Sequence, residues 1–212
     1  MKDNNSYSQR SEQQVALDFF GDFKGNFLSI GESNGEFYSN VRALAEIGWG
    51  GVCVEPDKAS FDELSQLYEG VDHIHCFNVA VSTETGVVPF YCLKEYLSGT
   101  IIGPASTLKK NEAHERKGSS YFMETTTNAM SWLDLLQISP IKKFDFVSID
   151  AGGSDLEILL QMDLKGMGVK LLCIEWNSVR EFRSSVDSFL RDYTLIHTNY
   201  KNLIYKLDGI NN

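Results

Sequence analysis

An apolar run that ends in two closely spaced glycines constrains the fold of this chain more than any other feature. Residues 27–30 favour a β-strand, and the turn Gly31-Glu32-Ser33-Asn34-Gly35 follows at once. Glycine accepts a positive φ and has no Cβ, so such a turn can bend sharply and approach a ligand closely. We therefore predict a strand, a ligand-binding turn and a helix over residues 36–47.

A second short apolar run, which follows Gly50, ends in Glu55-Pro56. In nucleotide-binding βαβ units, an acid about 20 residues beyond the glycines accepts hydrogen bonds from ribose hydroxyls. Glu55 has this spacing from Gly31. The two features together predict a nucleoside pocket, with Gly31, Ser33 and Gly35 in the cradle.

The composition is that of a soluble globular protein, and 212 residues suit one domain over residues 1–212, with a polar segment at 1–14. No run approaches the ~18 apolar residues that span a bilayer. The net charge of -10 and the pI near 4.8 disfavour a nucleic-acid partner, since phosphate binding depends on clustered Lys and Arg. We expect a cytoplasmic protein without a membrane partner. The four cysteines lack metal-binding spacing and are expected to be buried free thiols.

Strand and helix patterns alternate along the rest of the chain, which favours a mostly parallel sheet. Ser154 is the expected N-cap of one of the helices. Two strands at the carboxyl end predict an antiparallel pair. The predicted helices cover residues 58–67, 131–137, 155–162 and 179–191, and the predicted strands cover 73–81, 86–93, 144–150, 169–175, 193–197 and 202–207. Residues 94–127 show little periodicity and are interpreted as an insert that is either a lid or an ordinary loop.

Polar residues stand where several of these strands end. In open α/β sheets, ligands bind outside the carboxyl ends of the strands, so we expect these residues to converge on one crevice. Each also has a purely structural interpretation: the Asn can cap a turn, the Asp can cap the following helix, and the Glu can pair with Arg180. The residues are Gly31, Glu55, Asn78, Asp150 and Glu175.

Several sequence blocks resemble the FkbM-type S-adenosylmethionine-dependent methyltransferases. The most specific are Gly48-Trp49-Gly50-Gly51 with Glu55-Pro56, and Ser148-Ile149-Asp150 with Leu156-Glu157-Ile158-Leu159. Residues 27–35, Asn78-Val79-Ala80-Val81-Ser82 and Cys173-Ile174-Glu175-Trp176-Asn177 also match, in the expected order. The resemblance implies a Rossmann-like, seven-stranded methyltransferase fold and S-adenosylmethionine as cofactor. It adds Pro56, Asn78, Val79 and Asp150 to the cofactor-binding residues.

The chain departs from the family pattern at three places. Ser29 stands where an acid usually begins the glycine turn, and Gly31-Glu32-Ser33 stands where the family usually has Gly-Ala-Asn. Glu32 is expected to supply the carboxylate near the cofactor's amino group. Where the family usually reads Asp-x-Glu-Gly, this chain reads Asp150-Ala151-Gly152-Gly153, which lacks one of two acids. We therefore assign no metal ligand.

The resemblance favours O-methylation of a small-molecule or carbohydrate hydroxyl. A hydroxyl acceptor needs a nearby base, and a carboxylate or an imidazole within hydrogen-bond reach can serve. Asp150 is the first candidate, Glu175 supports it, and His114 in the insert is a rival. Trp176 follows a strand end and could form a wall for an acceptor.

Two other classes of function remain open. A catalytically degenerate, cofactor-binding module would explain the acid missing at Gly152. The turn also spells Gly-x-Ser-x-Gly, so a serine hydrolase with Ser33, Asp150 and His197 is a weaker alternative. A dinucleotide oxidoreductase is disfavoured because Ser33 occupies the middle position of Gly-x-Gly-x-x-Gly.

Overall fold

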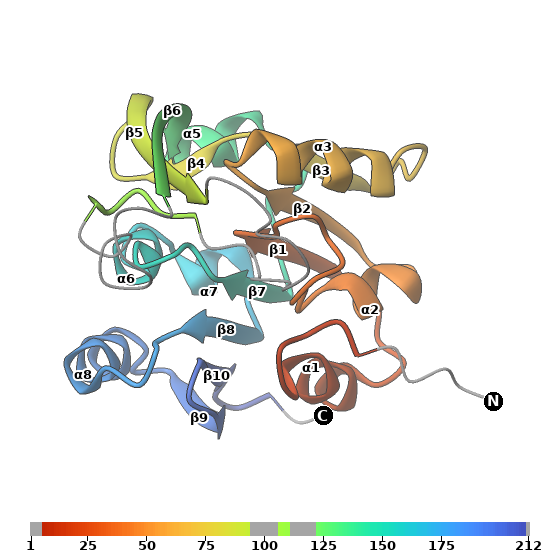
Figure 1. Ribbon diagram of the computed structural model, residues 1–212. Helices are drawn as coiled ribbons and strands as arrows, with labels where there is room; N and C mark the ends of the chain where they lie inside the picture. Colours follow the sequence, from red (N-terminus) through yellow and green to blue (C-terminus); the bar gives the residue numbers. More distant parts are fainter. Residues whose placement is uncertain (1–5, 94–105, 111–121, 211–212) are drawn as a thin grey trace.

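A seven-stranded sheet with helices on both faces forms the body of the molecule (Figure 1). The computed structural model describes residues 6–93, 106–110 and 122–210. The strand order is β3-β2-β1-β7-β8-β10-β9, and β10 runs antiparallel to β8 and β9 while the other pairs are parallel. The predicted mostly parallel sheet with an antiparallel carboxyl-terminal pair is confirmed.

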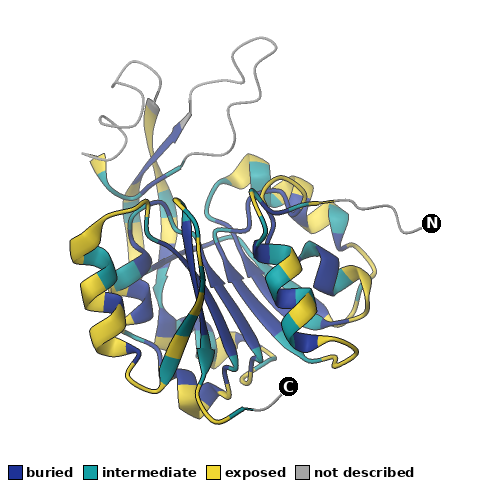
Figure 2. Cartoon of the chain, turned by 90° about the horizontal axis from the view of Figure 1, so that it is seen from below, coloured by how far each residue is buried: buried dark blue, intermediate teal, exposed yellow. Residues whose placement is uncertain are grey.

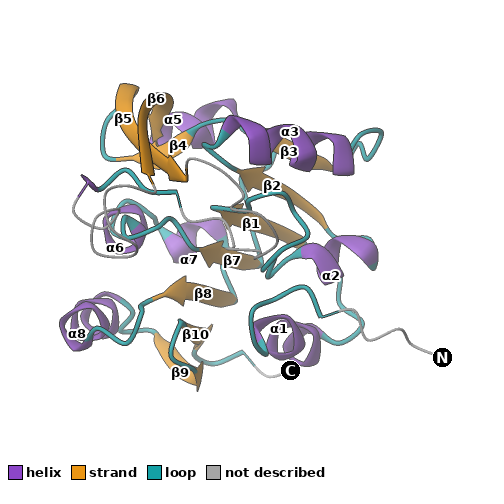
Figure 3. Cartoon of the chain, viewed as in Figure 1, coloured by secondary structure: helices purple, strands orange, loops and turns teal. Residues whose placement is uncertain are grey.

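The strands of this sheet are β1 (Asn26–Ile30), β2 (Gly50–Val54), β3 (Ile74–Phe77), β7 (Phe146–Ile149), β8 (Leu171–Glu175), β9 (Tyr193–Thr198) and β10 (Asn202–Leu207). A second, three-stranded sheet in the order β4-β6-β5 consists of β4 (Ala80–Ser82), β5 (Gly86–Leu93) and β6 (Phe122–Ser131). The helices are α1 (Glu12–Phe20), α2 (Arg42–Glu46), α3 (Lys58–Leu67), α5 (Trp132–Ile138), α6 (Asp155–Leu159), α7 (Leu164–Met167) and α8 (Arg180–Phe189). Figure 3 shows the helices flanking the strands.

Two apolar clusters fill the space between the sheet and its helices. One contains Trp132 of α5, Ile158 of α6 and Val186 of α8, and the other contains Ala16 of α1, Leu44 of α2 and Leu64 of α3. The central strands β1, β2, β7 and β8 are almost entirely buried, while the outer faces of the helices are exposed (Figure 2). Near-continuous apolar strands are typical of a parallel sheet covered on both faces. The cysteines are free thiols, as predicted, and three of the four are buried.

The register of the central strands brings their carboxyl ends to one level. Ile30 of β1 pairs with Val54 of β2 and with Ile149 of β7, and Ile149 pairs with Ile174 of β8. The residues that follow these strands therefore lie side by side at one edge of the sheet. This edge is where open α/β sheets bind ligands.

The helix predicted over residues 36–47 is much shorter, and this prediction is wrong at its start. The side-chain oxygen of Asn34 accepts hydrogen bonds from the N–H groups of Glu36 and Phe37, at 3.1 and 3.0 Å, and Tyr38 has a φ of 64°. Local side-chain bonds of this kind compete with helix formation. The helix α2 therefore begins only at Arg42.

The helix after β7 is also shorter than predicted, because α6 ends at Leu159 rather than at residue 162. Ser154 occupies the N-cap position, but its side chain makes no capping hydrogen bond. The Asp155 carboxylate instead accepts the N–H groups of Ala151 and Gly153, at 2.7 and 2.9 Å. The prediction of a Ser154 side-chain cap is therefore wrong.

The segment predicted as one strand over residues 73–81 divides between the two sheets. Asn78 interrupts it, and its side-chain amide donates to the carbonyls of Glu55 and Pro56 at 2.9 and 3.2 Å. Residues 80–82 then pair with β6 as β4. Strand β6 was not predicted, and it begins at Phe122, inside the segment interpreted as an insert. Helix α1 was not predicted either.

Candidate functional site

A cavity of about 830 Å³ lies at the carboxyl ends of the central strands. Its volume is in the range typical of small-molecule sites, roughly 300–1,000 Å³. Residues from the loops after β1, β2, β7 and β8 line it, as do residues of the second sheet and of the segment 106–108. The polar lining residues include Ser33, Glu55, Thr107, Asp150, Asp155, Glu175 and Lys201, and the aromatic ones include Phe37, Tyr38, Phe90, Trp176 and Phe182.

The glycine turn forms one wall because Gly31 allows β1 and β7 to end in contact. Gly31 has a φ of 81°, and a Cβ at this position would lie 1.8 Å from the carbonyl oxygen of Asp150. Gly31 and Glu32 both donate their N–H groups to the carbonyl of Val54 at the end of β2, at 2.9 and 3.2 Å. Only glycine fits this position, so the turn is fixed between two neighbouring strands.

Glu55 joins the end of β2 to the glycine turn. One of its carboxylate oxygens accepts the Ser33 N–H at 2.8 Å, and the other accepts the Asp57 N–H at 2.8 Å. Burial raises the pKa of Glu55 to about 7 against these two hydrogen bonds. Each carboxylate oxygen retains a further lone pair that can accept a hydroxyl. Glu55 is therefore placed as the sequence predicted for a ribose-binding acid.

Glu32 has a different environment from the one expected. Its carboxylate accepts hydrogen bonds from the hydroxyls of Ser29 and Ser39, each at 2.5 Å, and only 3% of Glu32 is exposed. Burial raises its pKa to about 7. The residues that line the cavity include Ser33 but not Glu32. Glu32 therefore stabilises the glycine turn from the side that does not line the cavity.

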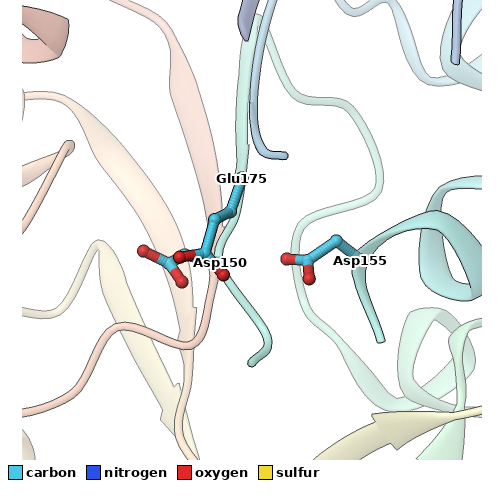
Figure 4. A group of neighbouring side chains, drawn as sticks. All are labelled: Asp150, Asp155 and Glu175. Atoms are coloured by element: carbon cyan, nitrogen blue, oxygen red, sulfur yellow. The ribbon is translucent and has the colours of Figure 1, made fainter. Parts of the chain in front are cut away.

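Three acids from neighbouring elements meet in the cavity (Figure 4). Asp150 follows β7, Asp155 begins α6 and Glu175 ends β8, and one oxygen of each lies within 4.8 Å of the others. Removal from water raises the pKa of Asp150 well above its usual value, and the negative charge of Glu175 raises it further. Burial likewise raises the pKa of Asp155 to about 7. A carboxyl with a raised pKa is a stronger base near neutral pH once it is ionised.

A lysine supplies positive charge beside these acids. The Lys201 ammonium, from the turn between β9 and β10, donates to Glu175 at 3.1 Å and to the side-chain oxygen of Asn177 at 2.7 Å. Its charge lowers the pKa of Asp150, opposing the larger effect of burial. The Lys201 ammonium already donates to Glu175, and the Ala151 and Gly153 N–H groups already donate to Asp155. We therefore do not assign a metal ion to the three acids.

The two loops that flank the acids have unusual backbone conformations. Among the described residues, those other than glycine with a positive φ are Ser33, Tyr38, Asn177 and Ser178. All lie in the loops after β1 and β8, and the first three line the cavity. Such conformations cluster at functional sites, where the surrounding structure imposes them. This clustering is independent of the acids and indicates the same site.

The structure brings together most of the residues that the sequence singled out. Those that line the cavity are Gly31, Ser33, Glu55, Pro56, Val79, Asp150, Glu175 and Trp176. Like Glu32, two further predicted residues do not line the cavity. Gly35 packs against α3, and a Cβ on Gly35 would lie 2.6 Å from Leu67. Asn78 hydrogen-bonds to the backbone at the end of β2. His114 lies outside the described residues.

The lining residues that were not recognised from the sequence as parts of the site include Asp155, Lys201 and Thr107. Asp155 was assigned only to a helix start, although its position after Asp150 was a usable signal. Lys201 and Thr107 lie in connecting segments that carry no motif. The serine-hydrolase triad is not assembled, because His197 lies on β9, beyond β8 and β10 from β7, with its Nε2 3.1 Å from the Ser11 hydroxyl.

Comparison with protein families decides the classification. The methyltransferase FkbM domain model matches residues 29–201, which contain the glycine turn, Glu55, the three acids and Lys201. The chain belongs to the FkbM methyltransferase family. A search of curated proteins gave no match.

Two solved structures show the same fold. An FkbM methyltransferase from Methylobacillus flagellatus KT superposes with a TM-score of 0.55 at 14% identity, over 86% of this chain and 43% of that one. The METTL16 methyltransferase domain superposes with a TM-score of 0.51 at 12% identity, over 94% of this chain and 65% of that one. The chain therefore spans less than two thirds of the length of either structure. The predicted methyltransferase fold is confirmed.

The helices were also compared with the length and hydropathy that a membrane span requires. Within residues 6–93, 106–110 and 122–210, no helix is both long and apolar enough to cross a bilayer.

Proposed function

We propose that this chain is an S-adenosylmethionine-dependent methyltransferase that methylates a hydroxyl of a small molecule or a carbohydrate. The observation that carries the proposal is the contact between Glu55 and Ser33. It places a carboxylate with free lone pairs in the lining of the cavity and directly beside the glycine turn. This is the arrangement that a ribose requires at the ends of two parallel strands.

The residues present fit this cofactor. The cavity volume of about 830 Å³ suits a nucleoside with an attached amino acid, and Gly31 leaves the cradle free of a side chain. Glu55 would accept the ribose hydroxyls, and Pro56, Val79 and Ala151 are apolar lining residues that would contact the rest of the cofactor. When bound, the cofactor supplies a methyl carbon that a positively charged sulfur activates.

Asp150 is the group that we assign to take the proton of the acceptor hydroxyl. It lies at the end of β7 in the cavity, beside Glu175, and its raised pKa gives it the basicity that this transfer needs near neutral pH. The positive charge of Lys201 opposes this rise in the pKa of Asp150. Much of the remaining acceleration would come from positioning the acceptor, which requires few further chemical groups.

The lining of the cavity also restricts the acceptor. Four carboxyl groups, those of Glu55, Asp150, Asp155 and Glu175, line it, and Lys201 is the cation among its described lining residues. This charge disfavours phosphorylated and other polyanionic acceptors, nucleic acids among them. Trp176, fixed by a hydrogen bond from its indole N–H to the Asn199 carbonyl at 2.8 Å, offers an apolar wall for an aliphatic or sugar ring.

Two measurements test the proposal. Isothermal titration calorimetry with S-adenosylhomocysteine should show one site per chain, and NAD should give no heat. Transfer of a radiolabelled methyl group to a panel of hydroxylated small molecules and sugars then tests turnover. Binding without turnover on any acceptor would favour the degenerate cofactor-binding module, and absence of binding would contradict the methyltransferase assignment for this chain.

A further inference from the structure

Residues 106–110 of the insert dock onto the turn that carries Asp150. Thr107 forms a β-bridge with Tyr91 of β5, in which the two residues exchange N–H to carbonyl bonds of 2.9 and 3.0 Å. Thr107 is 2% exposed. Ser106, Thr107 and Leu108 also line the cavity. This short segment therefore lies between the second sheet and the site.

Gly152 is the point of closest contact. It has a φ of 61°, and a Cβ there would lie 2.4 Å from the backbone carbonyl oxygen of Ser106. A side chain at this position is excluded twice, by the backbone conformation and by the neighbouring backbone. Gly152 stands where the family resemblance led us to expect an acid. In this chain the backbone of Ser106 occupies the space that such an acid would need.

Two side chains of the insert hold the outer carbonyls of the turn. The Thr107 hydroxyl donates to the Gly152 carbonyl at 2.7 Å and accepts the Lys109 N–H at 2.9 Å. The Lys109 ammonium donates to the Gly153 carbonyl at 2.7 Å and to Glu157 of α6 at 3.0 Å. The bonds to Gly152 and Gly153 join the insert to the segment between β7 and α6, the bond to Glu157 joins it to α6, and the bond between Thr107 and Lys109 lies within the insert.

The same turn is held from its inner side by Asp155. Its carboxylate accepts the N–H groups of Ala151 and Gly153, so the amides point inward while the carbonyls of Gly152 and Gly153 bond to the insert. The turn is thus fixed between two sets of hydrogen bonds. Of the two insert side chains, Thr107 is harder to replace than Lys109. Loss of its buried hydroxyl would remove a hydrogen bond from the buried Gly152 carbonyl, and an unpaired buried carbonyl is costly.

We infer that Thr107 is a positioning residue: its hydroxyl ties the insert to the Gly152 carbonyl and so holds the Asp150–Asp155 turn in its ligand-binding geometry. The inference rests on the proposed function, because it assigns the turn to the cofactor and acceptor site. It interprets the missing acid at Gly152 as an adaptation to a docked insert rather than as a loss of activity.

Four variants of the whole chain test this inference. Thr107→Val removes the hydroxyl and keeps the shape, and Thr107→Ser restores the hydroxyl. Lys109→Met removes the second hydrogen bond between the insert and the turn, the one to the Gly153 carbonyl. Because the Lys109 side chain is partly exposed, this variant keeps the inference testable if Thr107→Val does not fold. Thr194→Val is the matched control, because Thr194 is exposed on β9 and its hydroxyl bonds to Asp208 at 2.6 Å, away from the cavity lining.

Two readouts are compared for all variants. The first is the dissociation constant for S-adenosylhomocysteine, and the second is hydrogen exchange at the Ala151 and Gly153 amides of the ligand-free protein. Thr107→Val should weaken binding about tenfold and speed this exchange about tenfold, the loss expected for one buried hydrogen bond. Thr107→Ser should return both values to within about twofold of the wild type. Lys109→Met should change both in the same direction, about threefold, and Thr194→Val should change neither.

The readouts separate failure of the inference from failure of the proposed function. A wild-type chain that does not bind S-adenosylhomocysteine contradicts the function, while the exchange data still decide whether Thr107 holds the turn. Unchanged exchange in Thr107→Val and Lys109→Met overturns the inference. Faster exchange with unchanged binding also overturns it, because Thr107 would then be structural only, and so does a failure of serine to rescue.

Discussion

The Gly31 backbone packs directly on the carbonyl of Asp150, so closely that a Cβ on Gly31 would lie 1.8 Å from that oxygen. Strands β1 and β7 are neighbours, and the Asp150 N–H donates to the Ile30 carbonyl at 2.9 Å. The candidate cradle for the cofactor and the candidate base are therefore parts of one rigid contact. A substitution at Gly31 is therefore expected to displace Asp150, and a substitution that moves the Asp150 backbone is expected to displace the glycine turn.

Gly31→Ala should destabilise the fold by about 2–4 kcal/mol and abolish binding of S-adenosylhomocysteine, because the new methyl group must displace backbone. Urea denaturation and calorimetry measure the two effects. Gly70→Ala is the matched control, since Gly70 has a φ of 77° and a Cβ there would meet nothing within 4 Å. It should cost only the backbone strain, roughly 1 kcal/mol. Equal losses in the two variants would contradict the contact between Gly31 and Asp150.

Buried carboxyls should make the protein more stable at mildly acidic pH than at alkaline pH. Burial raises the pKa of Glu32 from 4.5 to about 7. Between these values the folded state binds more protons than the unfolded state, so the free energy of unfolding falls as the pH rises from 5 to 8. One such group contributes a fall of about 2 kcal/mol. Denaturation at several pH values measures it.

Glu32→Gln should reduce this fall by about the same 2 kcal/mol, since glutamine does not titrate. The remaining fall would come from Glu55 and Asp155, whose pKa values are raised to about 7 by burial. The control is Glu36→Gln, an exposed acid on the same loop. A wild-type stability that rises between pH 5 and 8 would show that these carboxyls are not buried in this way.

Asp150→Asn should lower the rate of methyl transfer by about 10²- to 10⁴-fold, the usual contribution of a general base. Affinity for S-adenosylhomocysteine should change by less than about threefold, because the amide keeps the size of the side chain. Asp62→Asn, on the exposed surface of α3, is the control. Undiminished turnover in Asp150→Asn would remove Asp150 from the mechanism and direct attention to Glu175.

Lys201→Met should move the acid limb of the rate profile to higher pH. The Lys201 charge lowers the pKa of Asp150, so its removal raises that pKa further, and the base is then ionised only at higher pH. The initial rate measured between pH 6 and 9.5 reports this shift. Lys165→Met, which breaks only a surface ion pair with Asp192, should leave the profile in place. A shift to lower pH would contradict the role of Lys201.

The sequence predicted the architecture well because that information is local and periodic. Helix α3 and strand β5 have the predicted bounds, and the apolar runs after Lys24, Trp49 and Phe144 became neighbouring parallel strands. The sequence failed where short-range side-chain bonds override periodicity, as at Asn34 before α2. It also failed at β6, whose pairing with β5 depends on residues far apart in the chain.

The amino-acid sequence by itself determined the family and the mostly parallel, seven-stranded fold that the family implies. It also determined the positions of Gly31, Glu55 and Asp150, because each is fixed by its place at the end of an apolar strand. Tertiary structure alone decided that Glu32 lies behind the turn, that Lys201 reaches Glu175 and that Thr107 reaches the Gly152 carbonyl. These residues carry no local pattern. Their roles come from contacts between segments that only folding brings together, and from the burial that shifts the pKa values of the acids.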